Sequence, residues 1–280
     1  MTSVLTLKKL LIKTKKQVFS EIIGNNTSPL KGEGYDFLEL KEYEYGEDAK
    51  NIDWVISAKL QKPYVKVFHA QKELNIYIVP MLCGSVYFGT SKMKQELITE
   101  ICSILGYSSI KQGDPFCSYI ANENIELITK KTKRIHGVHQ MAQSVYEYDV
   151  LGKTINNTNL LNELYSQIKK RSILFLIGDF FDIKNFDLKL LSKKHEVYVI
   201  ITRDHFEENP QELSNVNLID PNNYYNYEGS ISKKSIQNYK KQLKQNDHQL
   251  FEHLQKCGVK VIKIFTNEEP ISKLIGLLQR

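Results

Sequence analysis

Acidic side chains follow two apolar stretches of the sequence and are the residues best suited to chemistry. Asp179 and Asp182 come after the run SILFLI, and Asp204 comes after VYVIIT. Continuous apolar runs of this length are typical of strands that are buried on both faces. Carboxylates at the ends of such strands could hold Mg²⁺ for hydrolysis. A metal-dependent hydrolase that uses these three acids is therefore one hypothesis for the function.

The elements that would position these acids alternate along the chain from residue 74 onward. Strands separated by helices imply right-handed crossovers and a mostly parallel sheet with helices on both faces, which is a doubly wound α/β fold. Ligands of such folds bind at the carboxyl ends of the strands, where the strand order reverses. The predicted strands lie at 74–79, 116–120, 125–128, 172–177, 197–202 and 259–265. The predicted helices lie at 93–105, 138–148, 160–168, 185–194, 232–256 and 270–279.

The first 73 residues have a different pattern. Apolar residues at helical spacing predict an amphipathic helix over 4–23, and turn-forming residues follow at 24–29. A segment rich in Tyr, Glu and Lys comes next, with a strand predicted over 63–68 because apolar and polar residues alternate there. The sequence thus predicts two parts: an N-terminal helix with a small β-containing segment over 1–73, and the α/β domain over 74–280.

The segment at 32–54 carries the most specific text in the chain, GEGYDFLELKEYEYGEDAKNIDW. Its order and spacing resemble the bacterial proteins of the domain of unknown function 58 family, which share a pattern like G-x-G-x-x-F, Y-x-x-G-D-D and I-D-W. Gly178-Asp179-Phe180 is similar to the S-D-F that the family places after an apolar strand. The resemblance covers about residues 30–280. The matching residues in the first block are Gly32, Gly34, Phe37, Tyr43, Gly46, Asp48, Asp53 and Trp54.

This resemblance implies a von Willebrand factor A-like domain preceded by the signature segment. It also implies a role without catalysis, because genes of the family commonly accompany an AAA+ ATPase of the MoxR type. We expect an adaptor that works with such an ATPase and with an unknown protein client. Association with a membrane could then occur peripherally, through these partners.

A von Willebrand factor A-like fold often holds Mg²⁺ at a metal-ion-dependent adhesion site, whose first loop reads D-x-S-x-S. By the resemblance, Met81 and Cys83 stand where the Asp and the first Ser belong, and Ser85 matches the second Ser. Thr154 and Asp179 match the distant Thr and Asp. A thioether and a thiol are poor ligands for Mg²⁺. We therefore expect a degenerate site and no resident cofactor.

Structural roles compete with these functional ones. Asp179 or Asp182 could cap the helix predicted after the strand. The signature glycines could supply turns with positive φ. Trp54, the single tryptophan, is predicted to be a buried anchor, with Asp48 or Asp53 either accepting its indole N–H or pairing with Lys59. A surface for a partner is the alternative use of this segment.

Composition excludes several classes of protein. No stretch approaches the roughly 18 consecutive apolar residues that a membrane span needs, and lysines interrupt the N-terminal apolar residues, unlike a secretory signal. We expect a cytoplasmic protein with four reduced cysteines, since their spacing shows no metal motif. The net charge is +6, with lysine clusters at 8–16, 130–134 and 233–244. Nucleic-acid binding through these clusters is a further hypothesis, although no recognisable motif accompanies the charge.

Overall fold

The computed structural model describes residues 2–25, 37–45, 49–68 and 74–278, which form two units. The larger unit comprises residues 1–24 and 74–280, and the smaller one residues 25–73. The N-terminal helix α1 (Thr2–Asn25) packs with the larger unit, where Val18 enters the core and Lys13 pairs with Glu100. The sequence prediction had grouped this helix with the signature segment instead.

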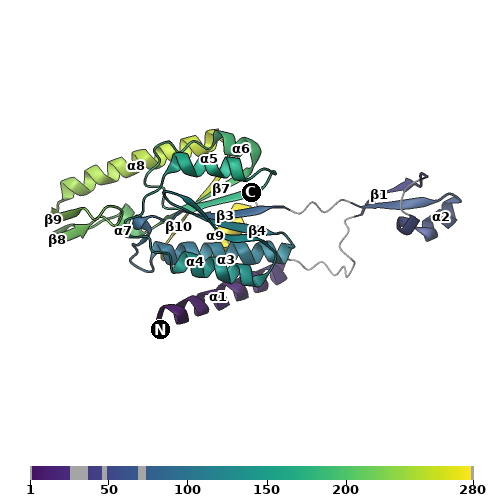
Figure 1. The fold of residues 1–280 in the computed structure, drawn as a ribbon, viewed down its shortest axis with the longest axis horizontal. Coiled ribbons are helices and arrows are strands. Elements are labelled where there is room, and N and C mark those ends of the chain that lie inside the picture. Colours follow the sequence, from purple (N-terminus) through teal and green to yellow (C-terminus); the bar gives the residue numbers. More distant parts are fainter. Residues whose placement is uncertain (1, 26–36, 46–48, 69–73, 279–280) are drawn as a thin grey trace. The chain divides into compact units, whose positions relative to one another are not determined.

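A six-stranded sheet forms the centre of the larger unit (Figure 1). Its spatial order is β5-β4-β3-β6-β7-β10, and all neighbours are parallel except β4 and β5. Numbered within this sheet alone, the order is 3-2-1-4-5-6, which is that of doubly wound folds. The predicted α/β class is confirmed. The strands are β3 (Ile76–Pro80), β4 (Phe116–Ala121), β5 (Ile125–Thr132), β6 (Ile173–Gly178), β7 (Glu196–Arg203) and β10 (Lys260–Phe265).

Helices cover both faces of this sheet, and each face has its own apolar core. Helices α1, α3 and α4 lie on one side in Figure 1, and α5, α6 and α8 on the other. Helix α8 buries one apolar stripe against its core, as its amphipathic sequence predicts. The bounds are α3 (Lys94–Gln112), α4 (Ile135–Tyr146), α5 (Asn157–Gln167), α6 (Lys189–Lys194), α8 (Lys233–Lys256) and α9 (Pro270–Leu278).

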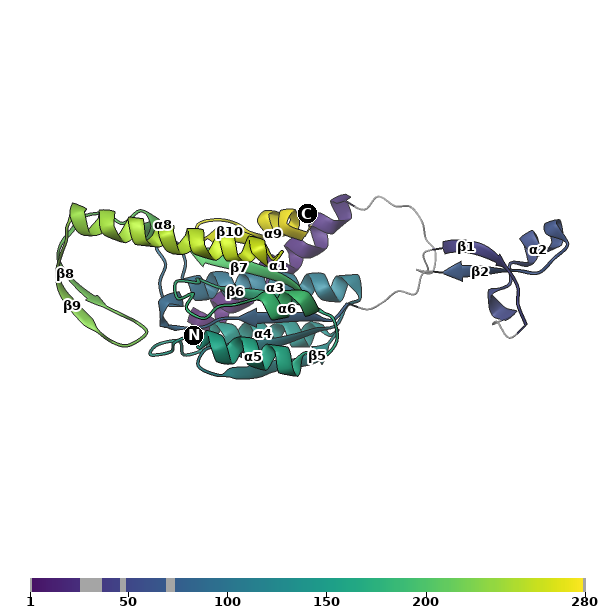
Figure 2. The same ribbon diagram turned by 90° about the horizontal axis from the view of Figure 1, so that it is seen from above.

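A β-hairpin that the sequence analysis did not predict lies between β7 and α8. A short helix, α7 (His205–Glu208), is followed by the antiparallel strands β8 (Leu213–Ile219) and β9 (Asn226–Ile231). The hairpin and the N-terminal part of α8 extend beyond the sheet on the same side (Figure 2). This extension adds a wall to the edge of the sheet where ligands of doubly wound folds bind.

The smaller unit is built on two antiparallel strands, β1 (Phe37–Glu42) and β2 (Tyr64–Phe68), joined through the short helices η1 (Ala49–Asn51) and α2 (Trp54–Leu60). Helix α2 is tied to β2 by hydrogen bonds, because the backbone N–H of Tyr64 donates to Ser57 Oγ at 2.8 Å. The strand predicted over 63–68 is confirmed, whereas β1 was not predicted.

Candidate functional site

The candidate site lies where the strand order of the sheet reverses, between the carboxyl ends of β3 and β6. Ser85 follows β3 in the short helix η2 (Gly84–Val86), and Asp179 directly follows β6. The Ser85 hydroxyl donates to Asp179 Oδ2 at 2.5 Å. Thr154 lines the same small pocket, of about 120 Å³, as these two residues. The structure therefore brings together Ser85, Thr154 and Asp179, the three residues matched to the adhesion site.

A buried lysine completes this cluster. Lys94, the first residue of α3, has no solvent-exposed side-chain surface. Its ammonium donates to Asp179 Oδ2 at 3.1 Å and to Glu207 Oε1 of α7 at 2.5 Å. The same nitrogen lies 4.9 Å from the centre of the Phe181 ring, a distance at which the ring face attracts a cation. One ammonium thus joins the ends of three elements: α3, β6 and α7.

The charges in this cluster set the protonation of its acids. Burial alone would raise the pKa of Asp179, but the positive charge of Lys94, the Ser85 hydrogen bond and the charge of Arg203 together hold it below its usual value. Burial raises the pKa of Glu207 in spite of Lys94. Asp179 is therefore the ionised partner of Lys94.

The residues present do not fit a divalent cation. Mg²⁺ takes six oxygen ligands in an octahedron, yet Met81 and Cys83 supply only sulfur. Burial and the charge of Asp179 raise the pKa of the Cys83 thiol to about 12, which keeps it protonated. Thr154 is directed elsewhere, because both its amide and its hydroxyl donate to Glu123. The Lys94 ammonium lies against the Asp179 oxygen that a metal ion would need.

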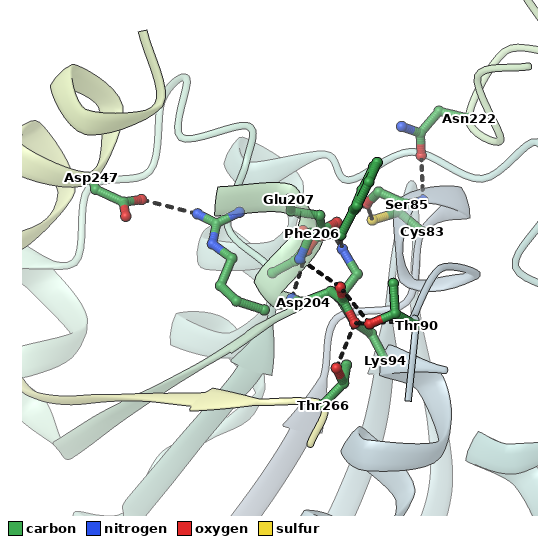
Figure 3. A network of polar contacts seen from close by, with 12 residues as sticks. Cys83, Ser85, Thr90, Lys94, Asp204, Phe206, Glu207, Asn222, Asp247 and Thr266 are labelled. Atoms are coloured by element: carbon green, nitrogen blue, oxygen red, sulfur yellow. Dashed lines mark hydrogen bonds and ion pairs between the residues drawn. The ribbon is translucent and has the colours of Figure 1, made fainter. Parts of the chain in front are cut away.

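Asp204 does not join Asp179 and Asp182 in one pocket, although all three were predicted at the same edge. Asp204 is buried and caps α7 through the amide of Phe206, and it accepts hydrogen bonds from Thr90 and Thr266 (Figure 3). Burial by itself would raise the pKa of Asp204, but these hydrogen bonds hold it below its usual value. Its oxygens are occupied by structural contacts.

The helix caps expected for the two acids after β6 are not found. Asp179 faces Ser85 and Lys94, and α6 begins only at Lys189, with Leu188 at its cap position. Asp182 is exposed and accepts from the amide of Lys184 in a local turn. The capping prediction is therefore wrong for Asp179, because ten residues separate the end of β6 from the start of α6.

A much larger cavity, of about 740 Å³, adjoins this cluster. Ser85 and Glu207 line it from the side of the sheet, and the hairpin forms another wall. Apart from these two residues and Ser235, the lining is apolar or aromatic. Several of the side chains around it are also exposed to solvent. The apolar and aromatic lining residues are Tyr87, Phe88, Leu151, Phe206, Pro210, Leu218, Ile219, Pro221, Tyr224, Ile231, Ile236 and Tyr239.

One further group of possible metal ligands occurs among the described residues, Asp187 with His253 and Cys257. Each of the first two already accepts a backbone amide: Leu188 donates to His253 Nε2 at 3.1 Å, and Lys189 donates to Asp187 Oδ1 at 3.0 Å. The bond from Leu188 holds the start of α6 against α8, and the bond from Lys189 closes a local turn at Asp187. The group therefore has a structural use, and its imidazole lone pair is already engaged.

The signature segment departs from its predicted packing at Trp54. This residue is 69 % exposed at the start of α2, so it is not the buried anchor that we expected. Asp53 does not pair with Lys59. It caps α2 through the amides of Val55 and Ile56 and pairs with Lys66 of β2 at 2.9 Å.

The other signature residues are only partly described. Gly32, Gly34, Gly46 and Asp48 lie outside the described residues, while Phe37 begins β1. The amide of Tyr43 donates to the carbonyl of Pro63 at 2.8 Å, which closes the end of the β1–β2 pair. Tyr43 and Asp53 therefore lie where α2 meets the two strands, whereas Phe37 pairs with Phe68 at their other end.

Comparison with known proteins identifies the family of this chain. A family model described as "Protein of unknown function DUF58" matches residues 39–249. The chain belongs to this family. Uncharacterized proteins of Mycobacterium bovis and Mycobacterium tuberculosis are similar to it, at 20 % identity over 275 residues, covering 96 % of this DUF58 chain and 86 % of each relative.

Solved structures that are similar to this one include the conserved hypothetical protein BatB from Bacteroides thetaiotaomicron. It has a TM-score of 0.44 and 10 % identity, covering 74 % of this DUF58 chain and 96 % of the other. A von Willebrand factor type A structure from Catenulispora acidiphila has a TM-score of 0.37 and 8 % identity, with 91 % and 51 % covered. Within the described residues, no helix combines the length and apolar character that crossing a bilayer requires.

Sequence reasoning missed Lys94, the hairpin and the cavity. A signal for Lys94 was present, because it precedes Leu97, Ile98 and Ile101 by three, four and seven residues and so shares their apolar helical face. The tyrosines at 224, 225 and 227 marked the hairpin, but the residues around them alternate too weakly to predict two strands.

Proposed function

We propose that this DUF58 protein is a non-enzymatic interaction protein that works in the cytoplasm with a MoxR-type AAA+ ATPase on a protein client. The partner class rests on the family resemblance. The observation that carries the interaction role is the apolar cavity of about 740 Å³ beside the edge of the sheet. Exposed aromatic and aliphatic side chains that surround a hollow are typical of surfaces that bind another protein.

The acids at this edge support a role without catalysis. Asp179 and Asp204 are buried and held by Lys94, Ser85, Thr90 and Thr266, while Asp182 is exposed and lies in a local turn. A general base or metal ligand needs a lone pair directed at the reacting group. Asp179 and Asp204 instead direct their lone pairs at donors of the protein itself.

The surroundings of the cavity indicate what the bound segment carries. Ile236 lines the cavity near the start of α8, and the exposed Lys233 and Lys234 precede it in the same helix. No ion pair to these two lysines is formed within the described part of the chain. We propose that the cavity receives apolar side chains of the ATPase and that the lysines attract carboxylates beside them.

The test is binding between this protein and a purified MoxR-type ATPase of the same organism, measured by biolayer interferometry with and without nucleotide. Ile219 is exposed and lines the cavity, so Ile219→Asp should weaken binding roughly 10- to 100-fold, the loss expected when one apolar anchor is no longer buried. Tyr225→Asp is the matched control, because Tyr225 is exposed on the same hairpin and does not line the cavity.

Equal binding by both variants would show that the cavity is not the contact surface. Absence of binding by the wild type in every nucleotide state would refute the partnership itself. A metal-dependent hydrolase predicts a different result: calorimetric binding of Mg²⁺ or Mn²⁺ that is lost in Asp179→Ala. That result, together with metal-dependent hydrolysis that is lost in the same variant, would replace the interaction role by an enzymatic one.

A further inference from the structure

Lys94 lies where a positive charge is needed at the edge of the sheet. Ser85 and Asp179 converge there from the ends of β3 and β6, and Glu207 approaches from α7. Without a cation, the buried Asp179 carboxylate and the partly buried Glu207 carboxylate would be destabilised, because burial disfavours ionised groups that lack an opposite charge. The Lys94 ammonium contacts both carboxylates and is itself fully buried.

We propose that the Lys94 ammonium is a built-in cation that takes the place of a divalent metal ion at this site. The Lys94 nitrogen lies 3.1 Å from Asp179 Oδ2 and 2.5 Å from Glu207 Oε1, which are hydrogen-bond distances between an ammonium and a carboxylate. The Phe181 ring faces the same nitrogen at 4.9 Å. Two carboxylates and one aromatic face are thus the contacts shown for this ammonium, which has no solvent-exposed surface.

This built-in cation has a consequence for the cavity. Ser85 and Glu207 both line the cavity, and both are joined to Lys94, directly for Glu207 and through Asp179 for Ser85. The ammonium therefore fixes two parts of the cavity wall to each other. The shape of the cavity is then set during folding and does not depend on the concentration of divalent ions. The inference stands whichever partner the cavity binds.

The test compares the thermal unfolding of the wild type, Lys94→Met and Lys94→Met/Asp179→Asn, with and without millimolar MgCl₂ or MnCl₂. Methionine is an unbranched apolar side chain of similar length that lacks the ammonium, so it removes the charge and its hydrogen bonds together. The wild type should unfold at the same temperature with and without metal. Lys94→Met should unfold roughly 10 °C lower, because the buried Asp179 and the partly buried Glu207 both lose the ammonium that pairs with them.

In Lys94→Met, the carboxylates of Asp179 and Glu207 and the Ser85 hydroxyl become free to bind an ion. Added Mg²⁺ or Mn²⁺ should therefore restore several degrees of the loss, since a ligand that binds only the folded state stabilises it. The double variant should unfold at a higher temperature than Lys94→Met without metal, because it removes one unpaired charge. Its response to metal should be lost.

Two outcomes would overturn the proposal. One is metal binding by the wild type that disappears in Asp179→Asn. Such binding would be seen as a shift in the unfolding temperature or in the electron paramagnetic resonance spectrum of Mn²⁺. The other is a Lys94→Met variant that is as stable as the wild type and does not respond to metal. If Lys94→Met does not fold alone, recovery of folded protein in the double variant supports the proposal and failure of both variants to fold contradicts it. Neither readout uses the ATPase, so the proposed function can fail separately.

Discussion

Gly84 should be the residue at which a single methyl group damages the candidate site most. It lies in η2, directly before Ser85, and a Cβ built on it would lie 2.0 Å from the carbonyl oxygen of Pro221. Ordinary contact begins at about 3.4 Å, so the backbone at Pro221 would have to move by about 1.4 Å. Backbone cannot yield as the end of a flexible side chain can.

This movement would disturb three hydrogen bonds that link the loop after β3, the segment at 152–153 and the turn of the hairpin. Gly84 N donates to Lys153 O at 3.0 Å, Gly152 N donates to Pro221 O at 2.8 Å, and Ser85 N donates to Asn222 Oδ1 at 3.1 Å. Overpacking typically costs about 1–3 kcal/mol. Each hydrogen bond that is lost adds roughly 0.5–1.5 kcal/mol. We expect Gly84→Ala to lower the free energy of unfolding by about 2–4 kcal/mol.

The assay is urea unfolding together with amide hydrogen exchange across 213–231, which should become faster in Gly84→Ala as the hairpin loosens. Gly276→Ala is the matched control, because Gly276 lies in α9 and the added Cβ would meet nothing within 4 Å apart from adjacent residues and the backbone of its own helix. There the same change should stabilise the protein by about 0.5–1 kcal/mol. The reasoning is refuted if Gly84→Ala keeps wild-type stability and exchange.

Two further predictions concern titration. Burial raises the pKa of Cys83 to about 12, so iodoacetamide at neutral pH should modify the partly exposed Cys257 long before Cys83. Peptide mass spectrometry can measure both rates. Equal rates would contradict the burial of the loop that carries Cys83. The folded pKa of Asp204 lies below the ordinary 3.8, so its stabilising effect is present above that value and is lost as the pH falls through the folded pKa. Asp204→Asn should therefore unfold at a lower temperature than the wild type at neutral pH, with a smaller difference in strong acid, and a difference independent of pH would argue against this linkage.

The architecture of the larger unit could be predicted because its central strands have continuously apolar sequences, which indicate burial. β6 and β7 are buried on both faces, and such runs allow few alternatives to a central parallel strand. The meeting of Ser85 and Asp179 was expected from the family resemblance, and the topology accounts for it, since the carboxyl ends of neighbouring parallel strands share one edge. The hairpin could not be predicted in this way. Most residues of its strands are exposed, and the stability of the strands depends on pairing and on neighbours that are distant in sequence.

The chemistry of the site depends on a residue that composition disfavours. Lysine is almost never fully buried unless it is paired, so a lysine at the start of a helix is ordinarily assigned to solvent. Its partners, Asp179 and Glu207, lie 85 and 113 residues away. Only the folded chain shows that all three meet. The helical face that Lys94 shares with Ile101 was the local indication that Lys94 is buried. The acids at the edge of the sheet explain how its charge is accommodated there.

The exposure of Trp54 separates two roles that the sequence had left together in the signature segment. Asp53 holds α2 by two amide bonds and joins it to β2 through Lys66, so Asp53→Ala should destabilise the smaller unit. Trp54 is 69 % exposed, and the adjacent Val55 is also largely exposed. A side chain in such a position contributes little to the free energy of unfolding. We therefore expect Trp54→Ala to keep wild-type hydrogen exchange over 54–60 while Asp53→Ala loses protection there.

If the segment is a partner surface, Trp54→Ala should also weaken ATPase binding, because exposed tryptophans are frequent anchors of interfaces. Ser85→Ala should leave exchange in the smaller unit unchanged, since the contacts of Ser85 lie within the larger one. Equal loss of protection in Trp54→Ala and Asp53→Ala would return Trp54 to a structural role. Unchanged binding in Trp54→Ala would assign partner recognition to the cavity of the larger unit instead.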